Sequence, residues 1–348
     1  MEHLDCSSGT EDGPLSSGFD DVHLIHRALS DVDARDIALG ISLWGRALPS
    51  PFLIDALTGG PPESVEINAS LARAARRAGW GLSVGSQRVG LEDEAARLSF
   101  TIVRDANPDG LVLANLSAGA TPEQAMVAVE MVAADLLQLH LNLPQELLMP
   151  EGERRFRGTR RAIRRVVEEC PVPVVAKEVG FGVSAETAAD LIGCKVAGIN
   201  VAGAGGSNFA GVEMSRTPSS DALPVAPDDF TRWGIPTAIS LTEVATVIRR
   251  GDRRVRVIAG GGIRSPLDAV RALVLGADMV SVAASAWRVL RSGGVDDLER
   301  FLLRWNRDAR HLMLLAGAPN VSSLSTLPYV ITGHTREYLQ QRGFPTAR

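Results

Sequence analysis

Short apolar runs recur along the chain, and each is followed by a glycine-containing or polar loop and then by an amphipathic stretch rich in Ala and Arg. Apolar runs with almost no internal charge are typical of parallel strands that are buried on both faces. The repeat of strand, loop and helix indicates βα units around a parallel sheet. The predicted strands are Pro51–Asp55, Gly81–Val84, Leu111–Asn115, Leu136–His140, Val172–Lys177, Gly198–Val201, Val255–Gly260 and Asp278–Ala283.

The amphipathic stretches between these strands predict helices. Thr121 and Ser265 stand at N-cap positions, where Ser and Thr are favoured. Each precedes a proline at the first helical position, where proline is favoured. Eight βα units favour an α/β fold, a closed (β/α)8 TIM barrel with a short N-terminal extension. An open doubly wound sheet would use the same units, but no Gly-x-Gly-x-x-Gly motif follows the first strand. The predicted helices include Ser64–Ala78, Thr121–Ala134, Thr159–Glu169, Ser184–Leu191 and Ser265–Leu275.

Two parts of the chain do not follow the repeat. Residues 1–18 are rich in Ser, Gly, Asp and Glu without periodicity, which predicts a mobile tail before one barrel domain at 19–348. Within the barrel, residues 203 to about 233 join the sixth strand to the next clear helix. A connection of that length is typical of a lid over a binding site or of a disordered insert.

The composition is that of an ordinary globular protein of 348 residues, 45% hydrophobic and 22% charged. The net charge is −5 and no basic stripe is interleaved with aromatic residues, which argues against nucleic acid as a partner. No segment contains a run of about 18 uncharged apolar residues, the length that a helix needs to cross a membrane. The acidic N-terminus does not resemble a signal peptide. Three cysteines without a Cys-x-x-Cys pair fit a reducing cytoplasm. We therefore expect a cytoplasmic protein that binds small molecules or other subunits.

Polar residues or glycines follow nearly every predicted strand. In a (β/α)8 barrel the active site is built from these C-terminal strand ends. Such convergence at seven or eight strand ends indicates a ligand that lies across the whole barrel mouth. The residues at these ends are Thr58, Ser86, Asn115, His140 to Glu146, Lys177, Glu178, Gly203 to Asn208, Gly260 to Arg264, and Ala283 to Ser285.

Glycines at the sixth and seventh strand ends point to a phosphate group. The run Gly260–Arg264 lets backbone amides approach a ligand closely, and the helix that follows contributes the positive end of its dipole. A tight βα turn would also contain glycines. The position after the seventh strand, paired with the loop Gly203–Ser207, favours phosphate binding.

Lys177 is one of only two lysines in the chain, the other being Lys195, although 36 residues are basic. A compact ammonium at the end of a buried strand suits an anionic ring atom or a developing charge better than a guanidinium does. The structural alternative is that Lys177 simply pairs with a carboxylate, for which Glu178 is the nearest candidate.

The strand ends together resemble one family, the type II isopentenyl-diphosphate isomerases, from about Phe19 to Ala286. Each motif is weak alone, but their order is specific. The resemblance implies an FMN-dependent TIM barrel that interconverts isopentenyl and dimethylallyl diphosphate in isoprenoid biosynthesis. It further implies magnesium, a flavin reduced by NADPH, no net redox change, and a homo-oligomer of four or more subunits. The motifs lie at Phe52–Gly60, Gly85–Arg88, Ala114–Leu116, His140–Glu146, Lys177–Gly182, Val201–Ser207, Trp233–Thr237 and Gly261–Arg264.

The resemblance also implies roles for single residues. It assigns Glu146 to magnesium, and it makes Gln145, His140 and Lys177 catalytic. The substrate would be bound by Arg88, His140, Asn142 and Gln145. The cofactor would be bound by Ala56, Leu57, Thr58, Ser86, Asn115, Lys177, Ser207, Gly261, Gly262, Arg264, Ala283 and Ala284.

The sequence departs from the family pattern at its N-terminus. Family members usually carry an Arg-Lys-x-x-His segment there that grips the substrate diphosphate, whereas the first Lys or Arg of this chain is Arg27. The flavin site therefore looks intact and the diphosphate site reduced. Two alternatives to an isomerase follow: an FMN-dependent oxidoreductase paralogue acting on a substrate without diphosphate, and a flavin-binding scaffold without turnover. The retained His140, Gln145 and Glu146 argue against the scaffold.

Overall fold

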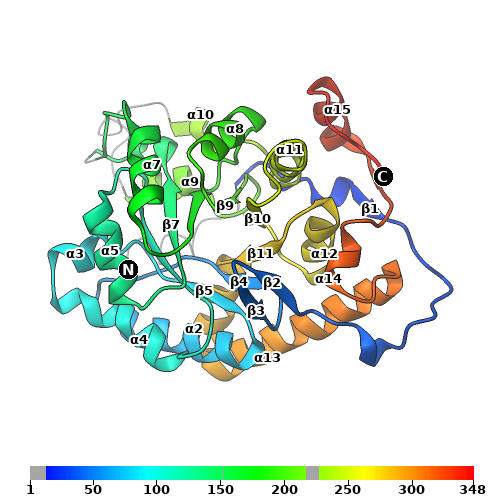
Figure 1. Ribbon diagram of the computed structural model, residues 1–348, viewed down its shortest axis with the longest axis horizontal. Helices are drawn as coiled ribbons and strands as arrows, with labels where there is room; N and C mark the ends of the chain where they lie inside the picture. Colours follow the sequence, from blue (N-terminus) through cyan, green and yellow to red (C-terminus); the bar gives the residue numbers. More distant parts are fainter. Residues whose placement is uncertain (1–12, 151, 217–226) are drawn as a thin grey trace.

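The structure, a computed structural model, describes residues 13–150, 152–216 and 227–348. Eight parallel strands form a closed barrel, in which the last strand pairs with the first (Figure 1). This closure confirms the predicted barrel and excludes the open sheet. The barrel strands are β4 (Phe52–Ile54), β5 (Gly81–Ser83), β6 (Val112–Ser117), β7 (Leu136–Leu141), β8 (Val174–Glu178), β9 (Gly198–Asn200), β10 (Arg256–Ala259) and β11 (Met279–Val282).

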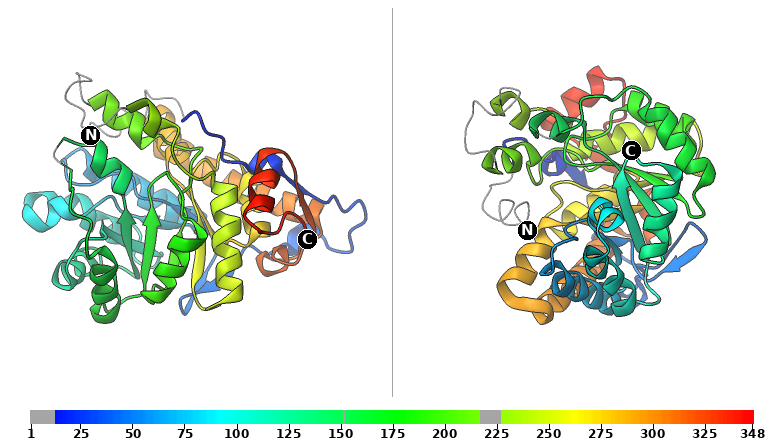
Figure 2. Two further views of the ribbon diagram at one scale, coloured as in Figure 1. Left: turned by 90° about the horizontal axis from the view of Figure 1, so that it is seen from above. Right: turned by 90° about the vertical axis from the view of Figure 1, so that its left-hand side faces the viewer.

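Helices surround the barrel, and their apolar faces pack on the outer side of the strands (Figures 1 and 2). The two predicted caps are present: Thr121 forms a capping box with Gln124, and the Ser265 hydroxyl accepts a hydrogen bond from the Asp268 amide. The Ser184 hydroxyl caps α8 in the same way. None of the described helices is long and apolar enough to cross a membrane. The main outer helices are α2 (Ser64–Ala78), α4 (Leu98–Ala106), α5 (Pro122–Met131), α7 (Thr159–Glu169), α8 (Ala185–Gly193), α11 (Thr237–Arg250), α12 (Pro266–Leu275) and α13 (Ala284–Ala316).

The barrel interior consists of an apolar layer below a polar one. Alternate residues of a strand face the same side, so interior positions recur at every second residue. Leu53, Leu136 and Met279 belong to the buried apolar cluster near the N-terminal strand ends. Two residues further along the same strands stand the buried Asp55, Gln138 and Ser281. The polar layer therefore forms the floor of the barrel mouth.

A hairpin closes the opposite end of the barrel. It consists of β2 (Ile41–Leu43) and β3 (Arg46–Leu48), joined by Trp44 and Gly45, both in the left-handed backbone region. Its leucines pack against the apolar interior layer, and the Trp44 indole donates to the Ala197 carbonyl over 3.1 Å. The mouth with the polar floor is thus the open end of the barrel.

The first and last elements of the described chain lie side by side outside the barrel (Figure 2). Strand β1 (Val22–Leu24) pairs antiparallel with β12 (Tyr329–Ile331), after which α15 (Gly333–Gln341) follows. Of the predicted tail, residues 1–12 lie outside the described residues. Ser17 is buried and its carbonyl accepts from the Ala238 amide over 2.9 Å, so the packed chain begins before Phe19.

The described part of the long connection after β9 is partly helical, which corrects its prediction as a loop. It contains α9 (Phe209–Arg216) and α10 (Pro227–Thr231). Helix α9 packs on α6 (Leu143–Leu148), and Ala210 joins Leu148 and Phe181 in a small apolar cluster. These helices are too short for their periodicity to stand out among the surrounding Gly, Ser and Pro residues.

Candidate active site

A cavity of about 370 Å³ lies at the C-terminal strand ends, within the size range of small-molecule and cofactor sites. Residues from the ends of all eight barrel strands line it. Of the residues predicted for the site, Thr58 and Arg88 are not in this lining. The predicted residues that line it are Ala56, Leu57, Ser86, Asn115, His140, Asn142, Gln145, Glu146, Lys177, Ser207, Gly261, Gly262, Arg264, Ala283 and Ala284.

Thr58 and Arg88 are placed elsewhere. The buried Thr58 hydroxyl lies 2.9 Å from the Ser64 hydroxyl at the start of α2, so it faces the helix and not the cavity. Arg88 begins the short helix α3 (Arg88–Glu92), its side chain is 82% exposed, and it forms an ion pair with Glu92. The structure therefore does not bring Arg88 to the cavity that the other predicted substrate residues line.

Lys177 ends β8 and enters the cavity floor. Its Nζ lies 3.6 Å from Asp55 Oδ2 and donates to the Glu178 carbonyl over 3.0 Å. The Glu178 carboxylate is not its partner, because Oε2 accepts three backbone amides of the following turn, those of Val179, Gly180 and Phe181. The side-chain partner of Lys177 is therefore Asp55.

Asp55 was not among the predicted site residues. Burial acts to raise the pKa of this carboxyl, but the Lys177 ammonium and hydrogen bonds from Ala56, Gln138 and Ser281 outweigh burial. The pKa of Asp55 is consequently held below its usual value, and the group is ionised. An acid that directly ends a fully apolar strand was the available signal, since a charge at that position enters the barrel mouth.

His140 is the direct register neighbour of Lys177 across β7 and β8. Burial, and then the Lys177 ammonium, lower the pKa of His140 to about 4, so the ring is neutral at pH 7. Asn115 Oδ1 lies 3.2 Å from Nδ1, and the Asn115 amide donates to the Val84 carbonyl. Because that oxygen can only accept, Nδ1 carries the hydrogen and Nε2 remains an acceptor.

The His140 ring is expected to titrate near pH 4, and Lys177→Met should move its pKa upward by removing the neighbouring charge. Histidine-labelled NMR would follow this, with His140→Gln identifying the signal among six histidines. In the unfolded chain the ring binds its proton near pH 6.5, so protonation costs stability as pH falls from about 6.5 to 4. Titration of His140 near pH 6.5 in the folded protein would contradict the expected burial.

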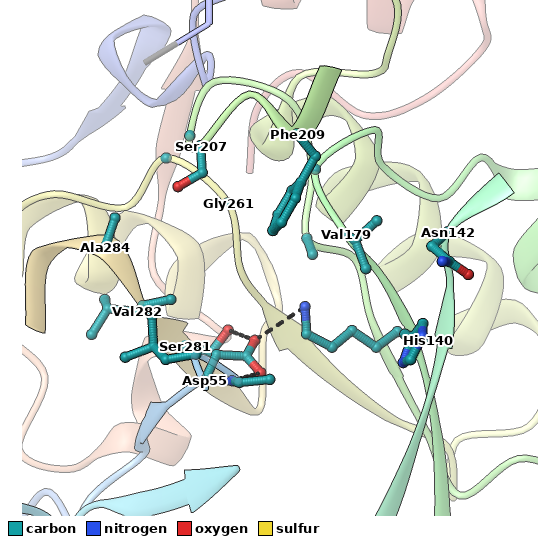
Figure 3. Close-up of a pocket in the computed structure, with 18 of the residues that line it drawn as sticks. Asp55, His140, Asn142, Val179, Ser207, Phe209, Gly261, Ser281, Val282 and Ala284 are labelled. Atoms are coloured by element: carbon teal, nitrogen blue, oxygen red, sulfur yellow. Dashed lines mark hydrogen bonds and ion pairs between the residues drawn. The ribbon is translucent and has the colours of Figure 1, made fainter. Parts of the chain in front are cut away.

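Helix α6 carries the polar groups of the substrate side of the cavity. Gln145 Nε2 donates to Glu213 Oε1 of α9 over 2.8 Å, and Glu213 is buried. Asn142 Nδ2 donates to Glu146 Oε1, while Glu146 Oε2 accepts from the Glu153 amide. In Figure 3, His140 and Asn142 lie across the cavity from Asp55 and Ser281. The orientation of Gln145 thus depends on α9, a contact that sequence alone did not assign.

The loops after β9 and β10 form a cradle of closely packed glycines. A Cβ on Gly261 would overlap the Gly203 carbonyl oxygen, and one on Gly262 would lie 2.5 Å from the Gly205 oxygen. Gly261 and Gly262 also have positive φ angles, where side chains are strained. Ala283 and Ala284, at the start of α13, line the same cavity. Backbone amides and a helix N-terminus at this place are the usual phosphate-binding arrangement of such barrels.

Comparisons with known proteins agree with this geometry. A family model described as FMN-dependent dehydrogenase matches residues 15–329. The isopentenyl-diphosphate delta-isomerase of Moorella thermoacetica is 49% identical over 342 residues, which cover 98% of this chain and 95% of that protein. The enzyme of the same name from Symbiobacterium thermophilum is 46% identical, over 95% of this chain and 89% of its own length.

Solved structures show the same fold at low sequence identity. A lactate oxidase of Pediococcus acidilactici is 16% identical, with a TM-score of 0.70 over 95% of this chain and 87% of that one. A mandelate oxidase is 17% identical, with a TM-score of 0.65 over 94% and 89%. These structural neighbours support the fold alone. The relatives of 46–49% identity show the family within that fold. The chain is a member of the FMN-dependent dehydrogenase family and, within it, of the isopentenyl-diphosphate delta-isomerase family.

Proposed function

We propose that the protein is an FMN- and magnesium-dependent isomerase that interconverts isopentenyl and dimethylallyl diphosphate. The observation that carries the proposal is one cavity that joins a glycine cradle for a phosphate to a wall with His140, Gln145 and Glu146. Two relatives named isopentenyl-diphosphate delta-isomerase match over almost the full chain.

The described residues fit FMN. The cradle leaves no room for a Cβ at Gly203, Gly205, Gly206 or Gly260–Gly262, and its close-packed backbone suits a phosphate group. Arg264 also lines the cavity. The Lys177 ammonium at the floor would face the ring system and offset negative charge on it. Bound flavin would supply a group that can give and accept the proton that the isomerisation moves.

The residues on the other wall fit a magnesium diphosphate. No group of three or more His, Cys, Asp or Glu side chains among the described residues could hold a metal by itself. Magnesium is usually bound by one or two carboxylates together with substrate phosphates. Glu146, held by Asn142, supplies a carboxylate of this kind at the cavity edge.

Moving the double bond requires a proton to be added at one carbon and removed from another. Gln145 is neutral and its amide nitrogen is committed to Glu213, so its oxygen is available to orient the alkene end. His140 is neutral at pH 7 and accepts through Nε2, so it positions the substrate without acting as a competing acid. Glu213 fixes the orientation of Gln145, and Asn115 fixes that of His140.

The direct test supplies purified protein with reduced FMN, magnesium and isopentenyl diphosphate and measures the dimethylallyl isomer. We expect isomer formation without net oxidation of the flavin. Bound flavin without isomer at millimolar substrate would exclude the isomerase. Stoichiometric flavin reoxidation by an organic acceptor under anaerobic conditions would instead support an oxidoreductase. NADPH as reductant and a homo-oligomer remain predictions from the family resemblance.

Glu146→Gln is expected to weaken magnesium binding, so that turnover requires more magnesium. The substitution keeps the size of the side chain and its bond to Asn142 but removes the charge that a hard cation requires. We expect a rise of about 10- to 100-fold in the magnesium concentration for half-maximal activity, with FMN binding unchanged. Glu153→Gln, in the segment that follows α6, is the matched control. Equal magnesium curves for parent and Glu146→Gln would refute the assignment.

A further inference from the structure

The polar floor of the barrel contains a hydrogen-bonded network centred on Asp55, for which the isomerisation described above has no role. Asp55 Oδ2 accepts from Asn200 Nδ2 over 2.9 Å and from Ser281 Oγ over 2.8 Å. Asp55 Oδ1 accepts from the Ala56 amide and from Gln138 Nε2. Every side chain in this network is at most 5% exposed.

The network is braced from several sides of the barrel. Gln138 also donates to Ser83 Oγ over 2.8 Å and accepts from Asn200 over 3.2 Å. With Asp55 and Ser281, the participants come from β5, β7 and β9 and from the ends of β4 and β11. Backbone hydrogen bonds of the barrel fix neighbouring strands relative to one another. The Asp55 carboxylate therefore cannot shift without breaking several buried hydrogen bonds. Its negative charge has a fixed position.

That fixed charge faces the single lysine of the cavity. Lys177 Nζ is 3.6 Å from Asp55 Oδ2, and the dashed lines in Figure 3 join Asp55 to the groups around it. Lys177 Nζ also donates a hydrogen bond to the Glu178 carbonyl. At this separation, with little water between them, the two charges interact strongly. The ammonium is therefore both placed and partly neutralised by Asp55.

We propose that Asp55 is a positioning residue that holds the Lys177 ammonium and sets the charge that this ammonium presents to the flavin. The inference rests on the proposed flavin binding for its effect on the cofactor. A lysine without this carboxylate would present a full positive charge and stabilise an anionic reduced ring more strongly. The Asp55–Lys177 pair instead presents nearly zero net charge, which favours a reduced flavin that keeps its proton and gives up its electrons more readily.

The first measurement is the flavin midpoint potential of Asp55→Asn, which keeps the shape and removes the charge. If Lys177 stays charged, the potential should rise by at least about 30 mV, which is a tenfold change for a two-electron couple. Lys177→Met combined with Asp55→Asn should abolish that rise. Ser281→Ala, which removes one hydrogen bond to Asp55 but no charge, is the matched control with a potential near that of the parent.

The second measurement does not need flavin. The chain has only two lysines, and the exposed Lys195 serves as an internal reference for acetylation by acetic anhydride, read by mass spectrometry. If Lys177 instead releases its proton in Asp55→Asn, its acetylation relative to Lys195 should rise at least tenfold. Should Asp55→Asn not fold, Asp55→Ser, which also lacks the charge, is measured in the same way.

A change in either readout supports the proposal, because the two readouts cover both responses open to the ammonium. A variant unchanged in both potential and acetylation ratio overturns it. Failure of the proposed function is distinguishable, since a parent protein that binds no FMN would still yield the acetylation ratios. A role for Asp55 in folding alone would lower thermal stability equally in Asp55→Asn and in the double variant but would not require Lys177 for any shift in potential.

Discussion

Gly261→Val is expected to weaken FMN binding by about 10²- to 10⁴-fold, the loss of two charge-assisted hydrogen bonds to the phosphate. Gly261 has φ of +94°, and an added Cβ would overlap the Gly203 carbonyl oxygen. A β-branched residue can relieve this overlap only by moving the two loops apart, which removes their amides from a shared phosphate. Fluorescence titration with FMN measures the effect.

The matched control for this glycine is Gly193→Ala. Gly193 ends α8, its added Cβ would meet no atom within 4 Å, and it does not have a positive φ. We expect parental FMN affinity and the parental midpoint of thermal unfolding for this control. If Gly261→Val is folded and binds FMN within about threefold of the parent, the phosphate does not lie in the glycine cradle.

Gln145→Leu is expected to lower the rate of isomerisation by about 10²- to 10⁴-fold, the range for losing a side chain that orients or relays a proton. Leucine has a similar volume, but it leaves buried Glu213 without the amide that it accepts from. The loss should appear in kcat, because Gln145 acts on the alkene end and not on the flavin phosphate. Steady-state kinetics with isopentenyl diphosphate separates kcat from KM.

The matched control is Gln341→Leu, at an exposed position at the end of α15. It makes the same chemical change far from the cavity and should leave kcat at the parental value. FMN affinity should be unchanged in both variants. A Gln145→Leu enzyme with more than a tenth of the parental kcat would remove Gln145 from the catalytic group.

The fold was predictable because buried parallel strands leave a simple signal. All eight barrel strands were located within a few residues, since each contains a short run that is mostly apolar. Helix α11 was expected only as the helix that follows about residue 233, and its bounds were not predicted because most of its residues are buried and no polar face repeats along it. Helix α13 was not predicted, and Gly294 interrupts its helical backbone. The pairing of β1 with β12 joins segments far apart in sequence, which no local pattern indicates.

The site was predictable as a set of positions but not as a set of contacts. Parallel strands bring their ends together, so residues such as Asn115, His140 and Lys177 had to share one mouth. Which groups pair depends on register and side-chain direction. The ion pair of Lys177 with Asp55, and the hydrogen bond between Gln145 and Glu213, therefore required the structure. Arg88 shows the converse, since its motif is present but its side chain faces outward.

The order in which the chain is synthesised gives the β4–β11 closure a consequence for cofactor loading. Strand β4 is made early and β11 late, so on the ribosome the intervening strands form a sheet with open edges. The glycine cradle faces Ala283 and Ala284 once β11 has joined β10, and Asp55 and Ala56 complete the cavity once β11 has also joined β4. Strand β12 must then emerge before β1 finds its partner. The cavity proposed for the flavin is therefore complete only after β11 has been synthesised and has closed the barrel.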